Sequence, residues 1–271
     1  MAKFVLALLA AMAMVLIALG AWRWTDKKAD QAVWAGLASH QPPAPAVFDP
    51  AMVSGLPAPA QRFFRFAIAP GTPLYTVTEF SMQGEFSLGS KAESNYMPMQ
   101  AEQILAAPYG FIWKIRAGDA VWFTGSDGAN DEISWSRFWL FGIVSVARAG
   151  NNEDHARAAF GRYVAEAVFW TPAALLPGDN VLWEPIDDTT ARVIVTHSGL
   201  EQAVDVSVEP DCRPSKVVFQ RPSNANLAQV FQPFGGYLST SKTSADFACQ
   251  PGSRPGISLR PTITSRFSRR P

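Results

Sequence analysis

The stretch "GRYVAEAVFWTPAALLP", residues 161–177, decides the fold that we expect, because it separates two groups of strand-like segments. Its composition is typical of a helix that ends at Pro172. Asn151 or Asn152 provides the side-chain cap at the other end, and acidic residues follow in the first turn. The sequence therefore predicts one long helix over residues 153–171.

Two kinds of side chain divide the surface of this predicted helix. At about 100° per residue, one arc is apolar and a second is polar. The apolar arc contains Ala156, Phe160, Tyr163, Val164 and Ala167, and the polar arc contains His155, Arg162 and Glu166. We considered Arg162 and Glu166 as a catalytic or carboxylate-binding strip, as a solvated ion pair, or as a contact that fixes the helix to a strand end. We favour the solvated ion pair, because such pairs are common on exposed helices.

Short runs of β-branched and aromatic residues lie on both sides of the helix, separated by Gly, Pro, Asn and Asp. The first group is "LYTVTEF", "GEFSL", "MQAEQIL", "GFIWKIR", "AVWFTG" and "EISWSRFWLFGIVSV"; the second is "VLWEPI", "TARVIVTH", "EQAVDVSV" and "KVVFQRP". In "ARVIVTH", Val193 and Val195 alternate with Ile194 and Thr196, which predicts that one face of the strand is more apolar than the other. We expect an α+β fold in which one curved antiparallel sheet, a half-barrel of about nine to eleven strands, packs on a few helices.

The N-terminal segment is apolar enough for a membrane. Residues 4–22 contain no charge and span about 28 Å as a helix, which matches a bilayer core. We expect an uncleaved transmembrane anchor, since Trp22 and Trp24 suit the interfacial belt, although Lys3 and the small residues near Gly20 also fit a cleaved signal peptide.

Two features of the sequence disagree about the side of the membrane on which the domain lies. Arg23, Lys27 and Lys28 outnumber Lys3, which favours a cytoplasmic domain, whereas the signal-like segment favours export. We expect the extracytoplasmic side.

Residues 23–50 show no sustained apolar period and predict a linker, and the folded domain is expected over residues 51–238. A short helix is expected at the start of that domain, beginning at Pro57 or Pro59 and ending before Pro70.

Composition excludes several classes of function. Lys plus Arg and Asp plus Glu number 23 each, so no net field attracts nucleic acid. Two cysteines, Cys212 and Cys249, are too few for a disulfide framework. The sequence contains no phosphate-binding loop, dinucleotide fingerprint or nucleophile elbow, so no cofactor is expected and an enzyme is less favoured than a binding protein.

Metal binding is not expected either. The acidic stretch "GSDGANDE", residues 125–132, lacks the ligand alternation of a calcium loop and is typical of a hairpin tip. His40, His155 and His197 are too scattered along the chain to predict a site.

Nine Trp and eighteen Phe residues favour either a large core or an apolar binding cavity. The hypothesis that we retain is a cavity for a lipid or another apolar ligand. Its expected lining is Trp113, Trp122, Phe160, Val164 and Val168. The alternatives are a structural or partner-binding envelope protein with an exposed patch around Phe169 and Trp170, and a hydrolase or isomerase that uses Arg162 and Glu166.

Four blocks, "GLPAPAQRFFRFA", "GFIWKIRAGDAVW", "GRYVAEAVFWTPAALLP" and "VLWEPIDDTTARV", resemble a family of bacterial membrane-anchored proteins of unknown function. The resemblance extends from about Val53 to Tyr237 and implies no activity. The matched positions of note are Arg62, Trp113, Arg162, Tyr163, Glu166 and Pro172. A remoter similarity in strand and turn rhythm to the lipoprotein-carrier (Lol-type) proteins implies a curved sheet around a lipid cavity.

The carboxyl end departs from the family. Residues 239–271 form a basic tail with no acidic residue after Asp246. We interpret this tail as the product of a frameshift near Ser239, because allowed codon choices for "STSKTSADF" and "PTITSRF" can encode family-like endings in the alternate frame. Sequencing of the gene tests this interpretation: an alternate frame without such an ending would contradict it.

Overall fold

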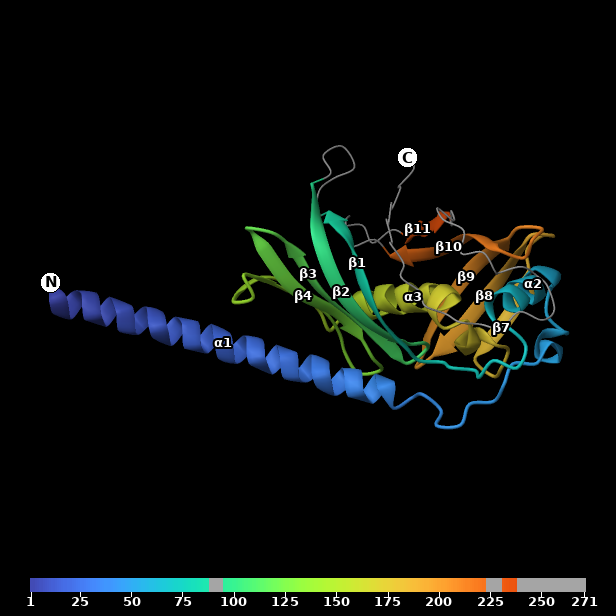
Figure 1. Cartoon of the computed structure of the whole chain (residues 1–271), viewed down its shortest axis with the longest axis horizontal. Coiled ribbons are helices and arrows are strands. Elements are labelled where there is room, and N and C mark those ends of the chain that lie inside the picture. Colours follow the sequence, from blue (N-terminus) through green and yellow to red (C-terminus); the bar gives the residue numbers. More distant parts are fainter. Residues whose placement is uncertain (88–94, 223–230, 238–271) are drawn as a thin grey trace.

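The computed structural model describes residues 1–87, 95–222 and 231–237 of the chain. It is an α+β fold arranged in layers (Figure 1). A long N-terminal helix lies along the outer face of a six-stranded antiparallel sheet, and a central helix lies between that sheet and a five-stranded one. The expected α+β class, the antiparallel strands and the N-terminal apolar helix are thereby confirmed.

The first sheet contains six strands in sequence order, each antiparallel to the next. They are β1 (Thr78–Ser87), β2 (Tyr96–Ala106), β3 (Gly110–Gly118), β4 (Trp122–Ala129), β5 (Ser134–Leu140) and β6 (Val144–Gly150). The runs "LYTVTEF" and "GEFSL" merge into β1, and the last run divides into β5 and β6. That division occurs at Phe141 and Gly142, which have φ angles of 50° and 68° and form a turn that reverses the chain.

The second sheet has the order β11-β10-β9-β8-β7 and is also antiparallel. Its strands are β7 (Val181–Pro185), β8 (Thr190–His197), β9 (Leu200–Val208), β10 (Pro214–Pro222) and β11 (Phe231–Tyr237). The predicted alternation in β8 is confirmed, since Val193 and Val195 are buried and Ile194 is half-buried.

The expectation of one continuous sheet is wrong, because β6 and β7 belong to different sheets separated by α3 (Glu153–Trp170). The cause lies in α3 itself, which is buried around most of its circumference. Small residues, Ala158, Ala159, Gly161 and Ala165, extend its buried surface beyond the predicted apolar arc. A helix without a solvated face is buried between two layers. A Cβ atom at Gly161 would lie 2.5 Å from Gln202 Oε1 of β9, so glycine permits this close approach.

The N-terminal helix, α1 (Ala2–Ala38), is 37 residues long, or about 55 Å. It is long and apolar enough to cross a membrane, and no residue of its most apolar window is buried. The helix then continues beyond Trp22 and packs on the first sheet through Asp26, Asp30 and Leu37, all of which are buried. Residues 23–38, which we assigned to a linker, are therefore helical and docked. Acidic residues in the contact stripe concealed its helical period.

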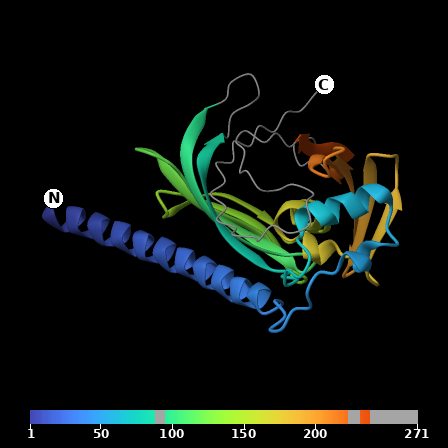
Figure 2. The ribbon, with the colours of Figure 1, turned by 45° about the vertical axis from the view of Figure 1, so that its right-hand side comes forward.

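The predicted short helix is present as α2 (Ala58–Ala67). Together with α3, it covers one face of the second sheet (Figure 2). Phe63 and Phe64 are fully buried and contact Trp183 of β7. Two short 3-10 helices, η1 (Pro50–Val53) and η2 (Pro172–Leu175), complete this region. The indole of Trp183 donates to the Leu175 carbonyl at 2.9 Å.

The two faces of the first sheet have different partners. We call the face toward α3 the inner face and the face toward α1 the outer face. Phe111 on the inner face contributes to the main core, whereas Ile112 on the outer face packs with Leu37 of α1. The basic tail over residues 239–271, and with it the frameshift interpretation, lies outside the described residues.

Candidate functional site

The polar arc of α3 is tied to the first sheet. Arg162 Nε donates to Glu166 Oε1 at 2.7 Å, and Arg162 Nη1 donates to Asp127 Oδ2 on β4. Glu166 Oε2 in turn accepts a hydrogen bond from the amide of Gln103 on β2. The expectation of a solvated ion pair is wrong, because the Arg162 side chain is only 22% exposed and contacts two strands. The geometry fits the third role considered, a contact that fixes the helix to the sheet.

A serine and a histidine extend this cluster. The Ser136 hydroxyl donates to Asp127 Oδ1 at 2.7 Å, and His155 Nε2 lies 3.2 Å from the same hydroxyl oxygen. In a hydrolase triad the imidazole lies between the serine and the carboxylate, so that it can accept the serine proton. Here the serine lies between the other two groups, and its proton points to the carboxylate. This order does not activate Ser136 as a nucleophile.

The charges of the cluster balance one another. Burial lowers the pKa of Arg162, but the adjacent Glu166 and Asp127 carboxylates outweigh that effect and raise the pKa overall. A second guanidinium, Arg221 on β10, has its pKa lowered by burial and by the nearby charge of Arg162. Two cations and two carboxylates therefore share the space between the sheets, and both cations stay charged at neutral pH.

His155 gives this cluster a pH dependence. Burial, reinforced by the charge of Arg221 and opposed by Asp127, lowers its pKa from 6.5. Its Nδ1 is buried without a hydrogen-bond partner, so the protonated ring would add an unsatisfied donor. The unfolded chain thus binds a proton near pH 6.5 more readily than the folded protein does. The stability that His155 contributes is complete above that pH and is lost as the pH falls toward the lower folded-state pKa.

We therefore expect the melting temperature of the wild-type protein to fall more steeply between about pH 7.5 and about pH 5.5 than that of His155→Gln. Expressed as the free energy of unfolding, the pH slopes of the two proteins differ by at most about 1.4 kcal/mol per pH unit, which is the limit for one proton. Thermal unfolding of the detergent-solubilised full chain, followed by circular dichroism, measures this difference. Parallel pH profiles for the two proteins would contradict the assignment.

Four of the five residues predicted to line an apolar cavity lie in or against the main core, and only Trp122 lies apart from them. Phe160, Val164 and Val168 are 2% exposed or less and belong to the core between the sheets. Trp113 is half-buried on the inner face, with its ring 5.5 Å from the Arg162 guanidinium. Trp122 lies on the opposite, outer face, where Arg116 stacks on it at 4.1 Å.

A different apolar surface occupies the inner face of the first sheet. Its buried members are Ala101, Ile115, Ala117 and Phe123, and its partly buried members are Met82, Phe86, Met97, Met99, Trp113 and Phe138. We call this set the apolar inner surface. On β1 and at the start of β2, half-buried inner-face residues alternate with exposed outer-face residues.

The sequence contains a signal for this surface in the alternation of residues along β1 and β2. In "FSMQGEF", residues 80–86, and "YMPMQA", residues 96–101, large apolar side chains of the inner face fall on alternate positions, with a gap at Gly84. Methionine adapts its shape to irregular apolar partners, and Met-rich surfaces are common in proteins that bind varied apolar ligands.

The remaining candidates lie apart from both features. The expectation of a hairpin tip holds only for residues 130–132 of the acidic stretch, since residues 125–129 lie in β4; Asp131 in the turn lies 2.7 Å from His197 Nε2. Among the residues that the structure describes, no three His, Cys, Asp or Glu side chains are arranged to hold a metal. Trp170 stacks on Phe80 at 4.3 Å, so of the proposed exposed pair only Phe169 remains exposed. Arg62 donates to the Asp188 carbonyl, a structural contact.

Comparison with known proteins gives a family and no activity. No curated protein and no solved structure matches the chain, so the similarity to lipoprotein carriers finds no support there. One family matches over residues 46–249, about three quarters of the sequence. This range includes both sheets and excludes the apolar part of α1. The chain belongs to a family of unknown function (DUF6544).

Proposed function

We propose that this protein is a membrane-anchored module that binds the apolar chain of a lipid on the apolar inner surface of its first sheet. The observation that carries the proposal is the set of partly exposed methionine and phenylalanine side chains there. A contiguous patch of large apolar side chains that remains accessible on a folded domain is typical of a binding surface. Of the lining residues that the sequence predicted, only Trp113 belongs to this surface, but the class of ligand is the same.

The position of the sheet relative to α1 supports a lipid as the ligand. Along β5, Trp135 packs in the cluster that contains Leu37, Arg137 contacts Asp30, and Trp139 contacts Trp22 at a ring distance of 5.2 Å. The strand therefore runs along α1 toward its apolar segment. The apolar inner surface includes Phe138, next to Trp139, so it lies at the end of the sheet that is closest to the expected bilayer.

The β5–β6 turn adds a second feature at this end. Phe141, Ile143, Val144 and Val146 are all between 41% and 55% exposed. Because this turn follows Trp139, it lies beside the part of α1 that we expect inside the membrane. Apolar side chains at that level enter the interfacial region of a bilayer, where their apolar surface is removed from water. We propose that the anchor is retained and that the domain rests on the extracytoplasmic membrane surface.

Native mass spectrometry of the full chain after mild detergent extraction tests the lipid site. We expect co-purified lipid with the wild-type protein and about tenfold less with Met97→Gln/Met99→Gln, since two apolar contacts are lost. The matched control is Glu85→Gln, an exposed outer-face position on the neighbouring strand β1, which should retain wild-type lipid.

Two outcomes would argue for the structural or partner-binding alternative. One is wild-type protein that carries no lipid after extraction. The other is equal lipid retention by the wild-type protein and the double methionine variant. In either case the apolar inner surface would act in packing or in contact with another protein.

A further inference from the structure

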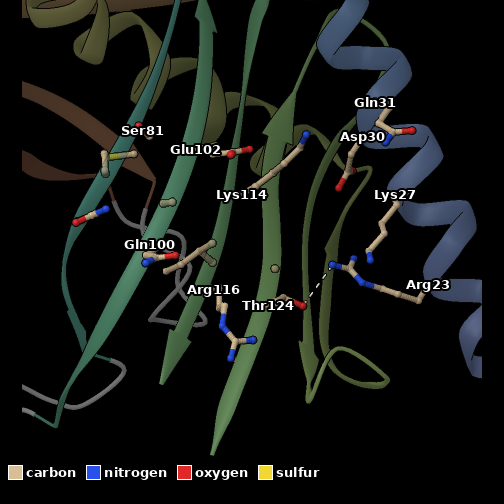
Figure 3. Close-up of a pocket in the computed structure, with 15 residues that line it drawn as sticks. Arg23, Lys27, Asp30, Gln31, Ser81, Gln100, Glu102, Lys114, Arg116 and Thr124 are labelled. Atoms are coloured by element: carbon tan, nitrogen blue, oxygen red, sulfur yellow. Dashed lines mark hydrogen bonds between the residues drawn. The ribbon is translucent and has the colours of Figure 1, made fainter. Parts of the chain in front are cut away.

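A polar cavity of about 450 Å³ lies between α1 and the outer face of the first sheet, on the opposite side of that sheet from the apolar inner surface (Figure 3). Side chains from α1 form one wall, and side chains from β1 to β4 form the other. The polar and charged residues of the lining are Arg23, Lys27, Asp30, Gln31, Ser81, Gln83, Gln100, Glu102, Lys114, Arg116 and Thr124.

The charge of this lining is positive. Four cations, Arg23 and Lys27 from α1 and Lys114 and Arg116 from β3, face two carboxylates, Asp30 and Glu102. Asp30 lies 3.5 Å from Arg137 outside the lining, so it is already shared with another cation. The lining therefore favours a ligand with negative charge.

Arg23 has hydrogen-bond donors that no described protein group accepts. Its Nη2 donates to Thr124 Oγ1 at 3.3 Å, a long hydrogen bond, as shown in Figure 3. Its Nε and Nη1 are buried without any hydrogen-bond partner. Buried donors are rarely left unpaired, because the loss of water is not compensated. A planar guanidinium edge with unpaired donors matches the oxygens of a phosphate, which it binds in bidentate geometry.

Arg116 presents the same group from the opposite wall. Its guanidinium lies 4.1 Å from the centre of the Trp122 ring, an arrangement that uses the flat face of the cation and leaves its N–H edge available. Lys114 is similarly placed over Trp34 at 4.2 Å. Aromatic support thus holds two cations of the sheet beside the cavity.

The cavity lies at the level expected for lipid headgroups. Arg23 is the first charged residue after the apolar segment of α1, and Lys27 follows one turn later. Phosphate groups of a bilayer lie directly outside its hydrocarbon core. Anionic lipids are attracted by basic residues at this position in membrane proteins.

We propose that this cavity binds a phosphate group, held between Arg23 of the anchor helix and Arg116 of the sheet. The source of that group is an anionic phospholipid or a soluble phosphate ion. The charged groups of this site lie on the outer face of the sheet, and Met82, Ala101 and Ile115 of the apolar inner surface also border the cavity.

Binding to the full-length protein in detergent tests the site, with three probes followed by native mass spectrometry: phosphatidylglycerol, phosphatidylcholine and inorganic phosphate. We expect phosphatidylglycerol to bind about tenfold more tightly than phosphatidylcholine, and Arg23→Gln to abolish that preference. Arg116→Gln, an exposed position on β3, should reduce the preference in the same direction, and it serves as the readout if Arg23→Gln does not fold.

Lys28→Gln is the matched control, because it removes one positive charge from the same helix near the membrane and does not line the cavity. Equal binding of the two lipids together with no binding of inorganic phosphate would overturn the proposal, as would a loss of preference in Lys28→Gln equal to that in Arg116→Gln. Displacement of phosphatidylglycerol by inorganic phosphate supports recognition of the phosphate from either source. Tight phosphatidylglycerol binding without displacement supports a lipid source, and inorganic phosphate binding without any lipid preference supports a soluble one. The methionine double variant should keep the headgroup preference, which separates this test from that of the acyl-chain site.

Discussion

Replacement of Asp26 by alanine will weaken the attachment of α1 to the first sheet by about 3 kcal/mol. Asp26 is 5% exposed, and its carboxylate accepts hydrogen bonds of 2.6 and 3.1 Å from the two Nη atoms of Arg148. Arg137 Nη1 lies 3.5 Å from the same carboxylate. Without it, two neighbouring guanidinium groups repel each other and lose their nearest shared anion. We take the lower end of the usual range because Arg148 is 33% exposed and is partly screened by water.

Hydrogen exchange of the full-length protein in nanodiscs measures this effect. For residues 27–38, which follow Asp26 in the docked half of α1, we expect exchange to accelerate about a hundredfold in Asp26→Ala, the equivalent of the expected loss in free energy. Lys28→Ala is the control, since Lys28 is exposed on the same helix and stacks on Trp24. Unchanged protection in Asp26→Ala would show that apolar contacts alone hold the helix.

Sequence patterns predicted the elements whose determinants are local. The ends of α3 follow from Asn152, whose side chain accepts a hydrogen bond from the His155 amide at 2.9 Å, and from Pro172 after its last turn. The strands β7 to β10 follow from alternation of valine with polar residues between turn residues. The apolar segment of α1 follows from its length and hydropathy alone.

Elements whose determinants are distant in sequence were not predicted. The docked half of α1 places Asp26 and Asp30 where an apolar stripe would be expected, and their partners Arg137 and Arg148 lie more than a hundred residues away. The division into two sheets depends on Gly161 and the alanines of α3, which carry little hydrophobic weight but allow a second sheet to approach. Small residues mark close packing only once the partner is known.

The candidate sites show the same limit. Arg162 and Glu166 were recognised as a pair one turn apart, but Asp127, which makes the pair structural, was read as part of an acidic hairpin. Trp113 and Trp122 lie on neighbouring strands, yet the pleat places them on opposite faces. A correct assignment required the register of β3 against β4 in addition to the composition of each strand.

Replacement of Arg162 by methionine will destabilise the protein by about 3 kcal/mol, because Asp127 and Glu166 then face each other without their shared cation. Methionine preserves the helix propensity and much of the packed volume, so the effect reports on charge. For a domain of this size, we expect the melting temperature to fall by roughly 6–12 °C. Thermal unfolding of the detergent-solubilised full chain at neutral pH measures the change.

The control is an arginine–carboxylate ion pair in a more solvent-exposed position. Arg192 Nε donates to Asp205 Oδ1 at 2.6 Å on the outer side of the second sheet, with side chains 38% and 30% exposed. Arg192→Met should cost less than about 1 kcal/mol, as exposed pairs do. The triple variant Arg162→Met/Asp127→Asn/Glu166→Gln should recover most of the lost stability, since it removes the unpaired carboxylates together with their cation. An equal loss in Arg162→Met and Arg192→Met, or no recovery in the triple variant, would show that Arg162 stabilises α3 through its packing on Phe111 and Trp113 rather than through its charge.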